Sequence, residues 1–226
     1  MNETIAGVLR RSAATRGRRI LLVATAGIGA LAAVALPAGL PPAQRTFAEF
    51  APQVQLLISV PLPFVGVLLG NDLRGTTGAR VLPTLGGATL IAVVAGLAGD
   101  VFAAAATAAS ASTAPDPWAH AGGTALAGVL VQVLAQLIGT GLGLLIAGPV
   151  WGCLATMVLP LGAYALLAPV GAARGWLTPY GAARQVLTGT AGAAQWTGWL
   201  VVALLWGVAL NAAGAARLAR TPAGRR

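Results

Sequence analysis

Six long apolar stretches, separated by short polar links, constrain the fold of this chain more than any other feature. A helix that crosses the hydrocarbon core of a membrane, about 30 Å thick, needs roughly 20 mostly apolar residues. Six windows meet this requirement: Ile20 to Leu40, Val54 to Gly70, Val81 to Ala106, Thr124 to Ala147, Val150 to Val170 and Trp196 to Ala216. The sequence therefore predicts an all-α, polytopic (multi-pass) membrane protein with six transmembrane helices.

The second window contains two prolines, Pro61 and Pro63. Because each proline removes a backbone hydrogen-bond donor, we expect the second helix to be kinked or broken at this point. Ser59 lies just before the prolines, and its hydroxyl has two interpretations. It either caps backbone groups that the prolines leave free or borders a path for a substrate.

The basic residues indicate how the helices are oriented. All fourteen are arginines, and eleven fall on one side of the predicted membrane: five before the first window, two after the second and four after the last. Arg45, Arg174 and Arg184 fall on the other side. Since short cytoplasmic segments accumulate basic residues, we expect both termini in the cytoplasm and the protein in the cell inner (plasma) membrane. The chain then divides into a cytoplasmic leader (1–19), a transmembrane domain (20–216) and a basic cytoplasmic tail (217–226).

The net charge of +9 does not indicate nucleic-acid binding. A nucleic-acid-binding surface gathers its basic residues on one polar face, whereas these arginines flank apolar windows in a chain with only 8% charged residues. Anionic headgroups of membrane lipids are the expected partners of the arginines.

The leader fits two descriptions. Ile5, Val8 and Leu9 share one face of a helix that Asn2 can cap, which predicts an amphipathic helix on the membrane surface. An Arg-rich start before an apolar stretch also describes a secretory signal peptide, but the window after Arg19 is longer than a typical signal core. We therefore expect a retained surface helix.

The fourth window carries a stripe of polar and small residues on one helical face: Gln132, Gln136, Gly139, Thr140 and Gly143. A polar side chain inside a membrane must find a partner or line water. Either the glycines let another helix approach while the glutamines hydrogen-bond across the contact, or the stripe borders a substrate path. We favour the packing interpretation, because such contacts are common in helix bundles of any function.

The sequence offers no residue set for catalysis or metal binding. It contains no evident nucleophile with its base and no pair of catalytic carboxylates, and Cys153 and His120 each stand alone. The absence of lysine also excludes a nucleotide-binding P-loop, which needs a lysine to reach the phosphates. We expect neither enzymatic activity nor a cofactor.

Several segments have a familiar order. An inner loop from Asn71 to Arg80 contains the sequence Asp-Leu-Arg-Gly-Thr, and Met157 to Gly162 is followed by Thr178 to Tyr180 in a long outer stretch before the last window. With six spans, both ends inside and an amphipathic leader, this order resembles the permease subunits of type-2 ATP-binding-cassette exporters, actinobacterial members in particular. The resemblance extends over essentially the whole chain.

The resemblance implies a permease subunit of an ATP-driven exporter. Such a subunit pairs with a second permease, as a homodimer or heterodimer, and is powered by a separate ATPase subunit. Asp72, Arg74 and Thr76 would lie at the ATPase contact, and the segment from Leu177 to Leu187 would dip back into the membrane.

Two other functions stay open. A proton-coupled secondary transporter needs a buried, paired ionisable residue near the middle of the membrane. Asp100 is the candidate, although we expect it near the outer end of the third window, with no arginine or glutamate placed to pair with it. The other possibility is a non-transporting membrane assembly subunit, in which the stripe of the fourth window is purely structural.

Overall fold

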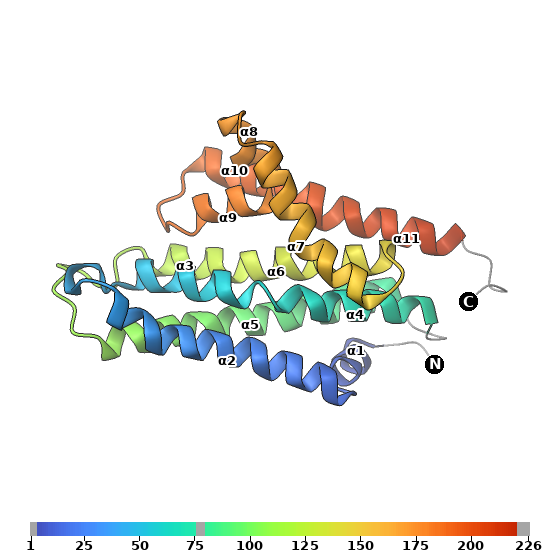
Figure 1. Cartoon of the computed structure of the whole chain (residues 1–226), viewed down its shortest axis with the longest axis horizontal. Helices are drawn as coiled ribbons and strands as arrows, with labels where there is room; N and C mark the ends of the chain where they lie inside the picture. The colour runs from blue at the N-terminus through green and yellow to red at the C-terminus, as the bar shows by residue number, and fades with distance from the viewer. Residues whose placement is uncertain (1–3, 76–79, 221–226) are drawn as a thin grey trace.

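The computed structural model describes residues 4–75 and 80–220, and the regular structure in these ranges is helical. Six helical segments in the described residues are long and apolar enough to cross a membrane (Figure 1): Arg16–Gly39, Phe47–Arg74, Val81–Ala109, Ala121–Leu145, Pro149–Leu166 and Ala193–Arg220. Each contains most of one predicted window. The prediction of an all-helical, multi-pass membrane protein is therefore confirmed, while the orientation of the chain across the membrane stays a prediction.

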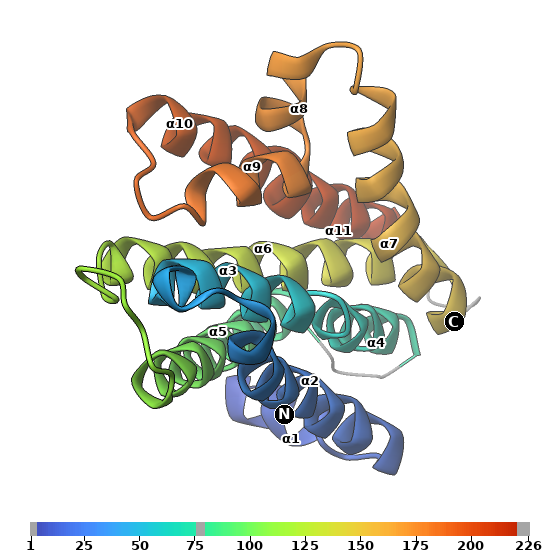
Figure 2. The same cartoon turned by 60° about the vertical axis from the view of Figure 1, so that its left-hand side comes forward.

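The helix α6 (Ala121–Leu145) runs through the middle of the bundle, between two groups of helices (Figures 1 and 2). The group on one side consists of α1 (Ile5–Ser12), α2 (Arg16–Gly39), α3 (Phe47–Ile58), α4 (Leu62–Gly75) and α5 (Val81–Ala109). The group on the other side consists of α7 (Pro149–Leu166), α8 (Gly171–Leu177), α9 (Pro179–Val186) and the last membrane helix, which comprises α10 (Ala193–Val202), a π-helical segment (Ala203–Ala209) and α11 (Leu210–Arg220). A short 3₁₀ helix (Pro42–Gln44) lies between α2 and α3.

Each group has its own apolar core. Phe50 and Ile58 of α3 pack with Ala103 of α5 in the first group. In the second, Ile138 of α6 packs in a cluster that includes Trp199 of α10. Since α6 takes part in contacts on both sides, 61% of its most apolar stretch is buried, against 22% for α2. The surfaces of the outer helices are left for lipid or for another protein.

The second span is broken, as its prolines predict. α3 ends at Ile58 and α4 begins at Leu62, with turn residues between them. The span also begins earlier than predicted, at Phe47 rather than Val54. The reason is packing: Phe47 and Phe50 are buried in the apolar core of the first group, so the helix continues into that core.

α4 and α6 pack through a seam of four glycines: Gly66 and Gly70 of α4, and Gly139 and Gly143 of α6. Each lies directly against backbone atoms of the other helix. A Cβ atom added to Gly66, for example, would be 2.6 Å from the carbonyl oxygen of Gln136. Because lipid gives no hydrophobic driving force between helices, such close contact is a main source of their association.

The leader helix α1 packs against the protein. It begins at Ile5, and the amide of Gly7 donates a hydrogen bond to the side chain of Thr4 at 3.3 Å, so Thr4 is the cap. Asn2, the predicted cap, lies outside the described residues. Val8 is fully buried and lies against Gly87 of α5. The helix is therefore attached to the bundle through one apolar face.

Two further helices extend beyond their predicted windows. α2 begins at Arg16 rather than Ile20, and α4 continues through Gly75, so the inner loop does not begin at Asn71. In both places polar side chains find partners inside the protein, and the helix therefore does not end where the apolar residues end. α1 and the last turn of α11 lie at the same end of the bundle (Figure 1). We call it the arginine-rich end, after Arg11, Arg18, Arg74 and Arg217.

Candidate functional site

An ion-pair network built around Asp72 dominates the arginine-rich end. Arg18 of α2 donates to both carboxylate oxygens of Asp72, at 2.7 and 2.9 Å, and the Nε atom of Arg11 lies 3.2 Å from Oδ2. The three side chains are only 12–21% exposed. A carboxylate that accepts two guanidinium donors from one arginine has a strong and directional contact. Asp72 therefore joins α1 and α2 to α4.

The same arginines extend the network to α5. Arg11 donates to the Thr84 hydroxyl in the first turn of α5, at 3.1 Å, and Arg18 also donates to the backbone carbonyl of Arg11, at 2.9 Å. Four helices thus meet through two arginines and one aspartate. A displacement of α1 at this end is therefore resisted by three membrane-spanning helices at once.

Two more arginines lie at the carboxyl end of α6. Arg74 donates to the carbonyl of Leu144, and Arg217 of α11 donates to the carbonyl of Leu145 at 2.7 Å. Carbonyl groups in the last turn of a helix have no partner within the helix, and cations are favourable there. These two contacts attach α4 and α11 to the end of α6.

Two of the three residues predicted to contact an ATPase are thus part of the protein's own packing. Asp72 and Arg74 lie in the last turns of α4 and contact neighbouring helices, while Thr76 lies outside the described residues. No local sequence pattern indicates these partners, because Asp72 pairs with an arginine 54 residues earlier. Direct contact of these side chains with another subunit stays a prediction.

A second polar group lies inside the membrane-spanning region. Gln132 of α6 donates to the backbone and side-chain oxygens of Gln55 on α3, at 2.7 and 2.8 Å. Gln55 in turn donates to Asp100 of α5 at 2.8 Å. Asp100 lies about 14 Å from the end of α5, at about 1.5 Å per residue, and its expected place near the outer membrane boundary stays a prediction. Gln55, which sequence reasoning missed, supplies its partner.

The rest of the α6 stripe contacts two other helices. With its side-chain amide assigned the orientation that satisfies both groups, Gln136 donates to the Leu62 carbonyl at 2.7 Å and accepts from the Gly66 amide at 3.3 Å, both on α4. The Thr140 hydroxyl lies 3.0 Å from the side-chain oxygen of Asn211 on α11. Gln132, Gln136 and Thr140 are at most 1% exposed. They make the interhelical contacts that the packing interpretation requires.

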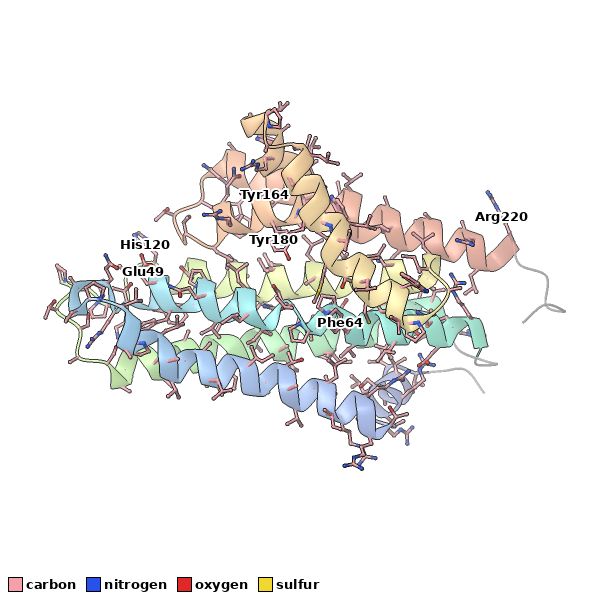
Figure 3. All side chains as sticks on the ribbon, viewed as in Figure 1. Glu49, Phe64, His120, Tyr164, Tyr180 and Arg220 are labelled. Carbon is pink, nitrogen blue, oxygen red and sulfur yellow. The ribbon has the colours of Figure 1, made fainter. Side chains whose placement is uncertain are left out.

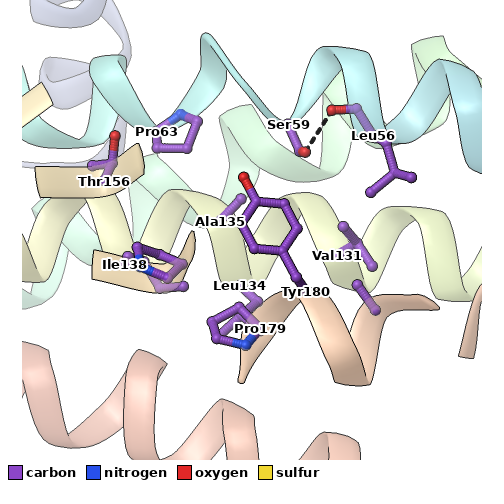
Figure 4. A pocket seen from close by; sticks show the side chains of 12 residues that line it. Leu56, Ser59, Pro63, Val131, Leu134, Ala135, Ile138, Thr156, Pro179 and Tyr180 are labelled. Carbon is purple, nitrogen blue, oxygen red and sulfur yellow. Dashed lines mark hydrogen bonds between the residues drawn. The ribbon is translucent and has the colours of Figure 1, made fainter. Parts of the chain in front are cut away.

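Ser59 is in a different environment. It lines a cavity of about 60 Å³ between the break in the second span, α6, α7 and α9 (Figure 4). Its hydroxyl donates to the Leu56 carbonyl at 2.7 Å, as the capping interpretation expects. The hydroxyl of Tyr180 on α9 points into the same cavity (Figure 4), and Thr156 of α7 contributes a third hydroxyl to its wall. Of the four residues proposed for a substrate path, Ser59 alone lines this cavity.

The segment before the last span forms two short helices, α8 and α9, rather than an extended loop. Thr178 caps α9 by accepting from the Gly181 amide at 3.1 Å, and Ala182 and Val186 of α9 are fully buried in the core of the second group. Whether this segment dips into a membrane stays a prediction.

Among the described residues, no three histidine, cysteine, aspartate or glutamate side chains group as metal ligands. No family model, curated protein or solved structure matches the chain.

Proposed function

We propose that this chain is the membrane-spanning permease subunit of an ATP-driven exporter, which forms the substrate path with a second permease and is powered by a separate ATPase. The observation that carries the proposal is the Asp72 network, which ties the leader helix α1 to α2, α4 and α5. A motor that pushes on the membrane subunit from outside needs such a stiff connection.

The arrangement of α4 supports a route from this network into the membrane. α4 is held at the arginine-rich end by Asp72 and packs on α6 through the glycine seam. Its other end is the break after Ile58, where the chain can bend. A push on α1 or on the connection between α4 and α5 would tilt α4 at this hinge. The cavity beside Ser59, which lies at the break, would change shape as α4 tilts.

Two further features agree with the proposal. The short helices α8 and α9 lie between the fifth and last membrane helices, where the resemblance implies a segment that returns into the membrane. The chain has no lysine, so a P-loop ATP site would belong to another chain. In this account the arginine-rich end faces the cytoplasm, where the ATPase binds, and the membrane is the plasma membrane.

A proton-coupled secondary transporter is the second candidate, and the contact between Gln55 and Asp100 favours it. A carboxyl group on a membrane-spanning helix, with a hydrogen-bonding partner on another helix, is a feature of proton pathways. This candidate needs no ATPase, and its transport would depend on Asp100. A non-transporting assembly subunit would need neither an ATPase nor the Asp100 carboxylate.

Co-purification separates these functions. The tagged protein is solubilised from its native host, and the proteins that accompany it are identified and assayed for ATP hydrolysis. We expect a P-loop ATPase with the wild type and with Asp100→Asn, and a reduced yield of it with Asp72→Asn. Asp116→Asn serves as the control, because Asp116 only accepts from the Trp118 amide. Recovery of no ATPase, together with proton-driven transport that Asp100→Asn abolishes, would overturn the proposal.

A further inference from the structure

Two arginines, one on α8 and one on α9, lie near the hydroxyl of Tyr164 on α7. Arg174 donates to this hydroxyl at 3.4 Å, and its guanidinium carbon lies 4.3 Å from the centre of the Tyr164 ring. Arg184, which is exposed, approaches the same hydroxyl. Within residues 4–75 and 80–220, no ion pair involves either arginine. Two like charges thus lie close together without a carboxylate in the described residues, and an anion bound between them would remove their repulsion.

Arg174 also has a hydrogen-bond donor that the described part of the chain leaves unused. Its Nε atom is buried and has no acceptor there. The Nε atom of Arg74 is likewise buried without an acceptor, whereas the Nε of Arg45 donates to the Leu40 carbonyl at 3.1 Å. A buried, unpaired N–H group carries a free-energy cost, which an acceptor from outside would remove.

The arginine cluster adjoins the cavity at the break in the second span through the contact between Tyr164 and Tyr180. The rings of Tyr164 and Tyr180 are in edge contact, with centroids 6.4 Å apart, and Figure 3 shows Tyr180 beneath Tyr164, toward α6. The Tyr180 hydroxyl then points into the cavity (Figure 4). Apart from its three hydroxyl groups, the wall is mainly apolar and includes Leu134 and Ile138.

From this juxtaposition we propose that the region binds an amphipathic anion, a molecule with one phosphate or carboxylate headgroup and an apolar chain. Arg174 and Arg184 bind the headgroup, since a guanidinium matches the geometry of both groups. The first carbon atoms of the chain pass Tyr180 into the cavity, whose volume of about 60 Å³ admits only a short part of it. The identification of this ligand as the exported molecule rests on the proposed function.

The test is a binding assay with the full-length protein in nanodiscs of zwitterionic lipid, corrected with protein-free nanodiscs. The probes are dodecyl phosphate, inorganic phosphate and dodecyltrimethylammonium. We expect dodecyl phosphate to bind most tightly and the cation to show no binding above the protein-free control. Replacement of both arginines, Arg174→Gln with Arg184→Gln, should lower the affinity for dodecyl phosphate about tenfold or more, because charge-assisted hydrogen bonds are lost. Arg45→Gln is the matched control and should leave the affinity unchanged.

Ala135→Leu fills the cavity from α6 without touching the arginines. It should weaken the binding of dodecyl phosphate while leaving the binding of inorganic phosphate unchanged. It also provides an independent test if the double arginine variant does not fold. Equal affinity for dodecyl phosphate and inorganic phosphate would overturn the proposal that the ligand is amphipathic. Unchanged binding of dodecyl phosphate in both variants would overturn the proposal that this region is the binding site. Since no ATPase takes part in this assay, such a failure leaves the permease proposal standing.

Discussion

The arginines of the Asp72 network and those of the α8–α9 region differ in what they contact. Arg11 and Arg18 pair with Asp72 and with acceptors on neighbouring helices. Arg174 contacts the hydroxyl of Tyr164, Arg184 lies near it, and neither arginine is in an ion pair within the described residues. The first set connects helices, because its charges are satisfied inside the protein. The second set keeps hydrogen-bonding capacity and positive charge available to a ligand.

This difference shows that composition alone does not assign a role to an arginine. From the sequence, all fourteen arginines served as markers of orientation, and Arg74 was also expected at the ATPase contact. In the folded chain their roles depend on the acceptors that tertiary packing brings to them. The comparison can be tested in three ways, from the largest expected effect to the smallest.

Removal of the shared acceptor should have the largest effect on stability. Asp72→Ala leaves Arg11 and Arg18 partly buried without their carboxylate, and we expect the free energy of unfolding to fall by about 3 kcal/mol. Denaturant unfolding in detergent micelles measures it. Asp116→Ala, in an exposed residue that only caps a turn, is the control. An equal loss in both variants would contradict a connecting role for Asp72.

The second test concerns the glycine seam, and it asks how much the close contact between α4 and α6 stabilises the fold. Gly139→Ala places a methyl group against the backbone of Pro63, and we expect a destabilisation of about 2 kcal/mol. Gly162→Ala on α7 is the matched control, because a Cβ there meets no atom within 4 Å. It should be neutral or stabilising by up to about 1 kcal/mol, since alanine favours a helix. Equal unfolding free energies for the two variants would contradict the close contact.

The smallest effect on stability should come from the α8–α9 arginines. Arg174→Gln with Arg184→Gln relieves repulsion between like charges while removing one hydrogen bond to Tyr164, so we expect a net change below about 1 kcal/mol. The same unfolding measurement applies. A loss as large as that of Asp72→Ala would mean that these arginines also hold the fold together, and the contrast between the two regions would disappear.

Local patterns account for the features that the sequence predicted well. Pro61 and Pro63 remove backbone donors wherever the helix lies, so the break between α3 and α4 follows from them directly. The spacing of Gly139 and Gly143 places both on one helical face, and the seam with α4 uses that face.

Features that depend on distant partners were beyond the sequence. Gln55 acquires its role from Asp100 and Gln132, on two other helices. Tyr180 enters the cavity because α9 folds back against the core of the second group. A local signal for Gln55 did exist: it is a polar residue within the second apolar window, where polar groups need partners.

The central claim is that a separate ATPase binds at the arginine-rich end, and photo-crosslinking tests it most directly. A photoreactive amino acid is placed at Arg10, which is exposed on α1, or at Ala111, which is exposed in the connection between α5 and α6. After irradiation in native membranes, the account predicts a crosslink to a P-loop ATPase from position 10 and none from position 111. Crosslinking to the ATPase from position 111 alone, or from neither position, would contradict it.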